Sequence, residues 1–177
     1  QQYVAQLPFV QELIPIDRQL IVTSTAVLPA GVEEQKPLLA SVLSQIEGNE
    51  FARVGLTGRF VTVGVVDAGF FGADSAAALR HIALRGGVRG IQDYVNPAKT
   101  GGNLFRTLET MSDFHGTEVL AAIAGFDPVD NIQYGLGIDA QFYLARTDQG
   151  NREFRGEEDN WVQAVEWLDS LGVRLVN

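Results

Sequence analysis

The chain has 177 residues, of which 46% are apolar and 20% are charged, so it is long and apolar enough for one globular domain, and disorder is excluded as its main state. Its 13 Lys and Arg against 22 Asp and Glu give a net charge of −9, which repels a phosphate backbone and argues against nucleic acid or an anionic membrane surface as a partner. The absence of cysteine excludes disulfides, zinc–thiolate sites and thiol nucleophiles, and 2 histidines disfavour a metal site built on histidine alone.

The N-terminal part of the chain predicts peripheral structure. Three prolines divide residues 1–30, which read as two extended pieces, 9–16 and 19–25, joined by turns. Residues 31–59 predict a polar linker with one short helix over 36–46, which ends at the Glu47-Gly48-Asn49 cluster.

From residue 60 onward, predicted strands alternate with predicted helices. The nearly continuous apolar run 60–67 indicates a strand buried on both faces, and further strands are predicted over 88–95, 141–146 and 173–176. A loop rich in Gly, Asn and Thr follows the second strand to about Met111. No apolar run reaches the ~20 residues of a membrane span.

Three helices separate these strands. One is predicted over 75–84 with Asp74 as its N-cap, and one begins at His115 and stops at Gly125. The third is capped by Asp159 or Asn160, ends at Gly172 and carries one apolar stripe, formed by Trp161, Ala164, Val165, Leu168 and Leu171. The alternation predicts an α/β fold with a mainly parallel sheet. Because the last strand stops without a turn, we expect the chain to be part of a longer one.

Two polar side chains lie where α/β sheets place functional groups. Asp67 ends the most apolar strand, at the edge where ligands and catalytic groups collect, although an Asp there also serves simply to cap a turn. His115 begins a helix, and Gly116 after it lets another backbone or a substrate approach closely. Alone, such a histidine is equally compatible with a capping or solvent-facing role, and His81, in the middle of a helix, is expected at the surface or boundary.

Together, Asp67 and His115 predict a specific contact. A carboxylate at a strand end can accept a hydrogen bond from the Nδ1–H of a histidine at a helix start, which fixes the tautomer in which Nε2 takes a proton from a nucleophile. Ser112 and Thr117 are close in sequence but cannot face Nε2 from the helix start. A dinucleotide site is disfavoured, because residues 67–72 lack the three spaced glycines it needs.

The residues around these two positions resemble known motifs. Residues 63–70, VGVVDAGF, are similar to the aspartate motif of subtilisin-like serine proteases (subtilases, peptidase family S8), and residues 113–125 resemble their His-Gly-Thr helix. Residues 134–143 and 157–173 are similar to later segments of that family, the last of them in a bacterial, typically secreted branch. The order of Asp before His is that of subtilisin.

This resemblance implies a subtilisin-like three-layer fold, incomplete in this chain, with residues 60–177 as the N-terminal part of the catalytic domain. It implies a secreted serine endopeptidase that acts on protein or peptide substrates, with Asp67 as the orienting carboxylate and His115 as general base and later acid. The family's nucleophilic Ser lies further along, so a complementary C-terminal segment that carries it is the implied partner. Residues 7–16 resemble the closing strand of an inhibitory propeptide, so residues 1–30 are either a propeptide remnant or peripheral strands.

Some properties stay open at the level of sequence. Calcium sites are common in the family, but no cluster of oxygen ligands stands out, and the acidic run 157–159 also suits a helix N-terminus, so no cofactor or metal site is predicted. Substrate-binding residues are not predicted, because the resemblance implies that the pocket walls belong mainly to the segment further along. The alternative function is a catalytically inactive subtilase-like module for binding or structure, against which the presence of both Asp67 and His115 argues.

Overall fold

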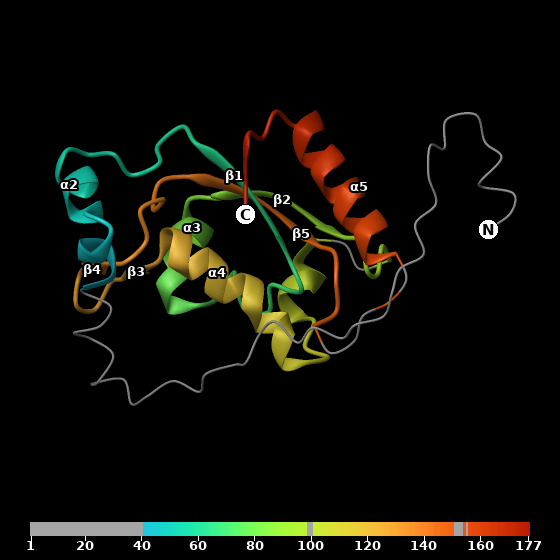
Figure 1. Ribbon diagram of the computed structural model, residues 1–177. Coiled ribbons are helices and arrows are strands. Elements are labelled where there is room, and N and C mark those ends of the chain that lie inside the picture. The colour runs from blue at the N-terminus through green and yellow to red at the C-terminus, as the bar shows by residue number, and fades with distance from the viewer. Residues whose placement is uncertain (1–40, 99–100, 151–153, 155) are drawn as a thin grey trace, which may run out of the picture.

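The computed structural model describes residues 41–98, 101–150, 154 and 156–177 (Figure 1). The extended pieces predicted over 9–16 and 19–25, and the start of the helix predicted over 36–46, lie outside these residues. Residues 41–45 are helical, and helix α2 (Gly48–Arg53) follows after a turn in which Glu47 has a φ of 55°. The first helix therefore ends near the predicted Glu47-Gly48-Asn49 cluster, but the break lies at 46–47, and the helix over 48–53 was not predicted.

Four parallel strands form the central sheet. They are β1 (Thr62–Asp67), β2 (Val88–Asp93), β5 (Gln141–Arg146) and β6 (Leu175–Val176), in the order β2-β5-β1-β6. All four predicted strands are confirmed, three of them with shorter ends; β1 starts only at Thr62, because Phe60 has a φ of 70° and is 93% exposed. The register runs from Thr62 opposite Gln141 to Asp67 opposite Arg146, so the carboxyl ends of β1 and β5 lie at one edge.

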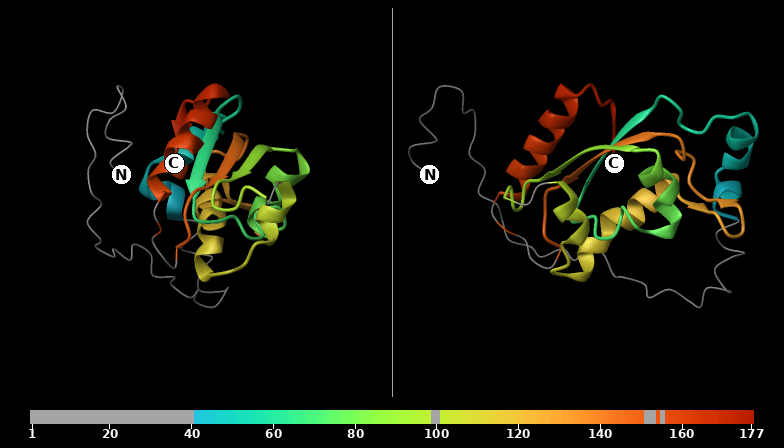
Figure 2. Two further views of the ribbon diagram at one scale, coloured as in Figure 1. Left: turned by 90° about the vertical axis from the view of Figure 1, so that its right-hand side faces the viewer. Right: turned by 180° about the vertical axis from the view of Figure 1, so that it is seen from behind.

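Helices cover both faces of the sheet and give the predicted three layers. Helix α5 (Glu157–Ser170) lies on one face, while α3 (Arg80–Leu84) and α4 (His115–Ala124) lie on the other (Figures 1 and 2). On the first face Leu168 packs directly against Gly64, where a Cβ would lie 2.6 Å from the leucine side chain. The opposite face carries the main core, which includes Val65, Leu120, Phe142 and Leu144.

The connections contain short elements that the sequence did not predict. Two 3-10 helices, η3 (Gly101–Arg106) and η4 (Met111–Phe114), lie in the segment expected to be a loop. An antiparallel pair, β3 (Phe126–Asp127) and β4 (Ile132–Gln133), follows α4. Among the described residues, no helix has both the length and the apolar character needed to cross a membrane.

Two predicted helices differ in how they begin. The segment 75–84 is divided into a 3-10 helix, η2 (Ala77–Leu79), and α3, and Asp74 caps neither, because the guanidinium of Arg106 donates to both of its carboxylate oxygens at 2.7 and 2.8 Å. Helix α5 begins after Gly156, which has a φ of 105°, so the caps predicted at Asp159 or Asn160 are wrong.

The apolar stripe predicted for the last helix is only partly buried. Ala164 and Leu168 are completely buried against the sheet, whereas Trp161 is 53% and Leu171 44% exposed. The side-chain amide of Asn160 donates to the carbonyl of Thr147 at 3.0 Å, which ties the start of the helix to the chain just after β5. The helix therefore contacts the sheet through a narrow central strip.

Candidate active site

Strand β1 ends at Asp67, and helix α4 begins at His115, at the same edge of the sheet. Nδ1 of His115 lies 2.9 Å from Oδ2 and 3.0 Å from Oδ1 of Asp67. Oδ1 also accepts a hydrogen bond from the Ala68 amide at 2.8 Å. The contact predicted from the sequence is confirmed, between residues 48 positions apart.

The two side chains differ sharply in burial. The carboxyl group of Asp67 is 8% exposed, whereas the imidazole of His115 is 47% exposed. Because Nδ1 faces the carboxylate, Nε2 is the ring nitrogen left to exchange a proton with a group that approaches from solvent. This geometry suits a general base that is oriented from behind by an acid.

Burial raises the pKa of Asp67 above its ordinary value, although the hydrogen bond and the charge of His115 oppose that rise. The nearby carboxylate of Asp148 raises the pKa of Asp67 further. Asp148 itself has a pKa raised by burial, and its charge interacts with His115. Two carboxylates, Asp67 and Asp148, therefore interact electrostatically with the imidazole, and the sequence predicted only the first of them.

Two glycines bring the helix and the strand together. The Gly116 amide donates to the carbonyl of Gly69 at 2.9 Å, and a Cβ on Gly116 would collide with that carbonyl oxygen. A Cβ on Gly69 would lie 2.6 Å from the Cα of Asp113. The close approach predicted at Gly116 is thus confirmed, and the approaching group is backbone. The Thr117 hydroxyl donates to the carbonyl of Phe71 at 2.9 Å, so its proton is engaged there.

A buried charged network that was not predicted from the sequence lies next to the pair. Arg146, at the end of β5, is 1% exposed and lies 3.1 Å from the carboxylate of Asp113 and 3.7 Å from that of Asp93. The available signal was the position of these residues: Arg146 ends a predicted strand, Asp93 lies two residues before the end of another, and Asp113 comes two residues before His115. Charged residues at the ends of adjacent parallel strands meet at one edge and must pair if they are covered.

The second histidine lies apart from this site. His81, on α3, is half-buried, in agreement with the predicted boundary position, and its ring packs edge-on against Phe126 with centroids 6.0 Å apart. Burial lowers its pKa, and the positive charge of Arg85 acts in the same direction. Nothing in its surroundings connects it to the Asp67–His115 pair.

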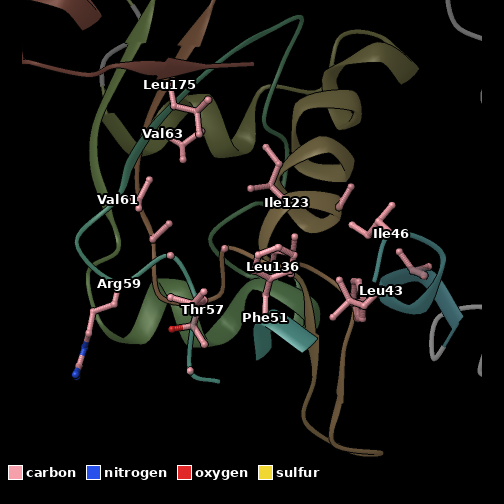
Figure 3. Close-up of a pocket in the computed structure, with 18 residues that line it drawn as sticks. Leu43, Ile46, Phe51, Thr57, Arg59, Val61, Val63, Ile123, Leu136 and Leu175 are labelled. Atoms are coloured by element: carbon pink, nitrogen blue, oxygen red, sulfur yellow. The ribbon is translucent and has the colours of Figure 1, made fainter. Parts of the chain in front are cut away.

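Potential metal ligands and an apolar cavity are two further features of the described residues. In the described ranges, no group of three or more His, Asp or Glu side chains is arranged to bind a metal ion. A cavity of about 600 Å³ lies near the start of β1, lined by Leu43, Phe51, Val61, Val63, Ile123 and Leu175 among others (Figure 3). Its lining is largely apolar and Arg59 extends away from it, so it lacks the convergent polar groups of a reactive site.

Comparison with known proteins places the fold. No family model matches the sequence, and no curated protein matches it. Among solved structures, MycP1 with its N-terminal propeptide removed has a TM-score of 0.54 at 24% identity, over 77% of this chain and 36% of that chain. MycP1 from the ESX-1 type VII secretion system has a TM-score of 0.50 at 22% identity, over 77% and 35%. This chain spans about a third of the length of these two structures, and its fold is the subtilisin-like α/β fold.

Proposed function

We propose that this chain is the aspartate–histidine part of a serine endopeptidase that hydrolyses peptide bonds in proteins or peptides. The observation that carries the proposal is the 2.9 Å contact between Nδ1 of His115 and the buried carboxylate of Asp67, at the carboxyl edge of the sheet in a subtilisin-like fold. A paired acid and base in this arrangement serve to activate a hydroxyl nucleophile.

In the proposed mechanism, Asp67 keeps the imidazole in the tautomer with its proton on Nδ1. Nε2 of His115 then takes the proton of a serine hydroxyl as that oxygen attacks the scissile carbonyl, and the Asp67 carboxylate stabilises the imidazolium that forms. The imidazolium returns the proton to the leaving amine, and the same residue activates water for deacylation. Both roles need an exposed Nε2 side and a buried Nδ1 side, which the exposures of the two side chains support.

The nucleophile and the oxyanion donors belong, in this proposal, to a complementary C-terminal segment of a longer protein. The solved structures with this fold are about three times as long as the matched part of this chain, which is consistent with such a segment. We also propose a secreted location, based on the bacterial branch of subtilases that residues 157–173 resemble. In this proposal the segment supplies the hydroxyl that His115 deprotonates and, with the oxyanion donors, most of the catalytic effect.

A fluorophosphonate probe on the full-length protein tests this function, because it labels only an activated serine. We expect labelling at one serine outside this chain, and loss of labelling in His115→Gln. His81→Gln is the matched control, since it removes the other imidazole at a half-buried position on α3, and it should keep full labelling. A folded full-length protein that takes up no probe would contradict the proposal and favour the inactive module.

A further inference from the structure

We propose that Arg146 is a positioning residue that holds the side chains of Asp67 and His115 at their hydrogen-bonding distance. Its guanidinium contacts the backbone just after Asp67 and the carboxylate just before His115, so one side chain links the acid and the base from below. The catalytic consequence rests on the function proposed above, whereas the link itself rests on the geometry of the described residues.

Arg146 is placed by the sheet. It is the last residue of β5, the strand between β1 and β2, and its register partners are Asp67 on one side and Asp93 on the other. Its side chain is 1% exposed and is the largest of the completely buried side chains. Burying a guanidinium costs free energy unless its charge is paired and its N–H groups are hydrogen-bonded, so the contacts of Arg146 are needed for its burial.

The contact on the acid side fixes the turn after β1. Nε of Arg146 donates to the carbonyl of Ala68 at 2.7 Å. The amide of the same residue donates to Oδ1 of Asp67 at 2.8 Å. Both backbone polar groups of Ala68 are therefore engaged, one by the catalytic carboxylate and the other by Arg146, and the orientation of the carboxylate depends on both.

The contact on the base side fixes the turn before α4. Nη2 of Arg146 lies 3.1 Å from Oδ1 of Asp113, while Oδ2 accepts hydrogen bonds from the amides of Glu109 and Thr110 at 2.6 and 2.8 Å. The carbonyl of Asp113 in turn accepts from the amide of Phe71 at 2.7 Å. Asp113 is two residues before His115, so the position of Asp113 determines where helix α4 begins and where the imidazole of His115 lies.

The planar guanidinium can connect the two turns because its three nitrogens face different partners. It donates to Ala68 and Asp113 from different nitrogens, and a third nitrogen lies 3.7 Å from Asp93. A lysine keeps the positive charge among the buried carboxylates but has a single nitrogen, so it cannot reproduce this fork. Arg146→Lys therefore separates the positioning role from simple charge compensation.

The experiment measures the His115 Nδ1–H signal by proton NMR in the full-length protein, assigned by its loss in His115→Gln. We expect Arg146→Lys to keep the native circular dichroism, to broaden or lose that signal, and to lower kcat by about 10² with little change in KM, because a small misplacement has that cost. The matched control is Arg85→Lys: this arginine also donates to two carbonyls, those of Ile138 and Ala140, but away from the pair, and both readouts should stay at wild-type values.

The outcomes separate this proposal from the proposed function. An unchanged signal and unchanged kcat in Arg146→Lys would overturn the positioning role and leave the peptidase function standing. A full-length protein without peptidase activity, in which Arg146→Lys still removes the signal, would overturn the function and keep the positioning role. If Arg146→Lys does not fold, Asp113→Asn tests the same link: loss of the signal supports it and a wild-type signal overturns it.

Discussion

At the scale of single residues, the candidate site is dominated by one buried carboxylate. Asp67 is 8% exposed, and burial raises its pKa in spite of the adjacent imidazole. The ionised carboxylate is therefore less favourable in the folded protein than in the unfolded one, and its contact with His115 offsets part of that cost. Such a residue is expected to cost stability where it supports activity.

If the proposed peptidase function holds, Asp67→Asn should lower kcat of the full-length protein by about 10⁴, because an amide beside Nδ1 favours the wrong imidazole tautomer. It should also change how stability depends on pH. Because the pKa of Asp67 is higher in the folded protein, the unfolded chain loses this proton at a lower pH than the folded protein does. Ionisation of Asp67 therefore begins to destabilise the fold at the pKa of the unfolded chain, and the full loss of stability is reached above the pKa of the folded protein. The wild type should thus lose stability relative to Asp67→Asn as pH rises from about 3 to neutral.

Urea unfolding of both proteins across that pH range measures the difference directly. A difference in the free energy of unfolding that does not vary with pH would contradict the raised pKa. An Asn variant with near-normal turnover would contradict the role proposed for Asp67, whatever its stability.

The two sides of this site were not equally predictable from sequence. Asp67 and His115 lie within local motifs, one at a strand end and one at a helix start, so their meeting followed from the parallel sheet. Arg146 and Asp148 carry no local signal that distinguishes a buried charge from an exposed one. Arg146 contacts the carbonyl of Ala68 and the carboxylate of Asp113, which are 78 and 33 residues away, and only the assembled structure brings these groups together.

At the scale of elements, the close packing of α4 against the end of β1 determines the distance between acid and base. The Gly116 amide donates to the carbonyl of Gly69, and the ring of Phe70 packs against Gly116. Neither contact can shift easily, because one partner is backbone and the other is a completely buried ring.

Gly116→Ala should therefore push α4 away from β1. The added Cβ would collide with the carbonyl of Gly69 and lie 2.7 Å from the ring of Phe70. We expect a loss of about 1–3 kcal/mol of stability, typical of overpacking, together with loss of the His115 Nδ1–H signal. Gly102→Ala is the control, since a Cβ there meets nothing within 4 Å. Equal stability of the two variants would show that α4 is not fastened in this way.

Helix starts were the least predictable elements, for a physical reason. Asp74 and Asn160 both have the chemistry of N-caps, yet each bonds elsewhere in the fold, to Arg106 and to Thr147, which are 32 and 13 residues away. A side chain that caps a helix in isolation gains about 1 kcal/mol, and a well-placed tertiary partner competes with that. Strand β5, by contrast, matches its predicted bounds, and its last three residues are all buried, because it lies between β1 and β2.

At the scale of the whole molecule, the edge of the sheet formed by β6 is apolar and exposed. Strand β6 pairs with β1, and the Asn177 backbone continues that ladder through hydrogen bonds of 2.9 Å to Gly64 and Val66. Within the described part of the chain β6 is an edge strand, and its apolar residues are exposed, Leu175 at 56% and Val176 at 41%. An exposed apolar edge is a template on which another strand can pair.

The 177-residue chain by itself should therefore self-associate, and Val176→Lys should reduce that association. A lysine on an edge strand opposes edge-to-edge pairing, while the partial exposure of Val176 lets the longer side chain reach solvent at little cost to folding. Sedimentation velocity over a range of protein concentrations measures the effect. Val129→Lys is the matched control, because Val129 is 86% exposed and lies between β3 and β4, away from the sheet edge. A wild-type chain that stays monomeric at every concentration, or equal association of the two variants, would show that the β6 edge does not drive assembly.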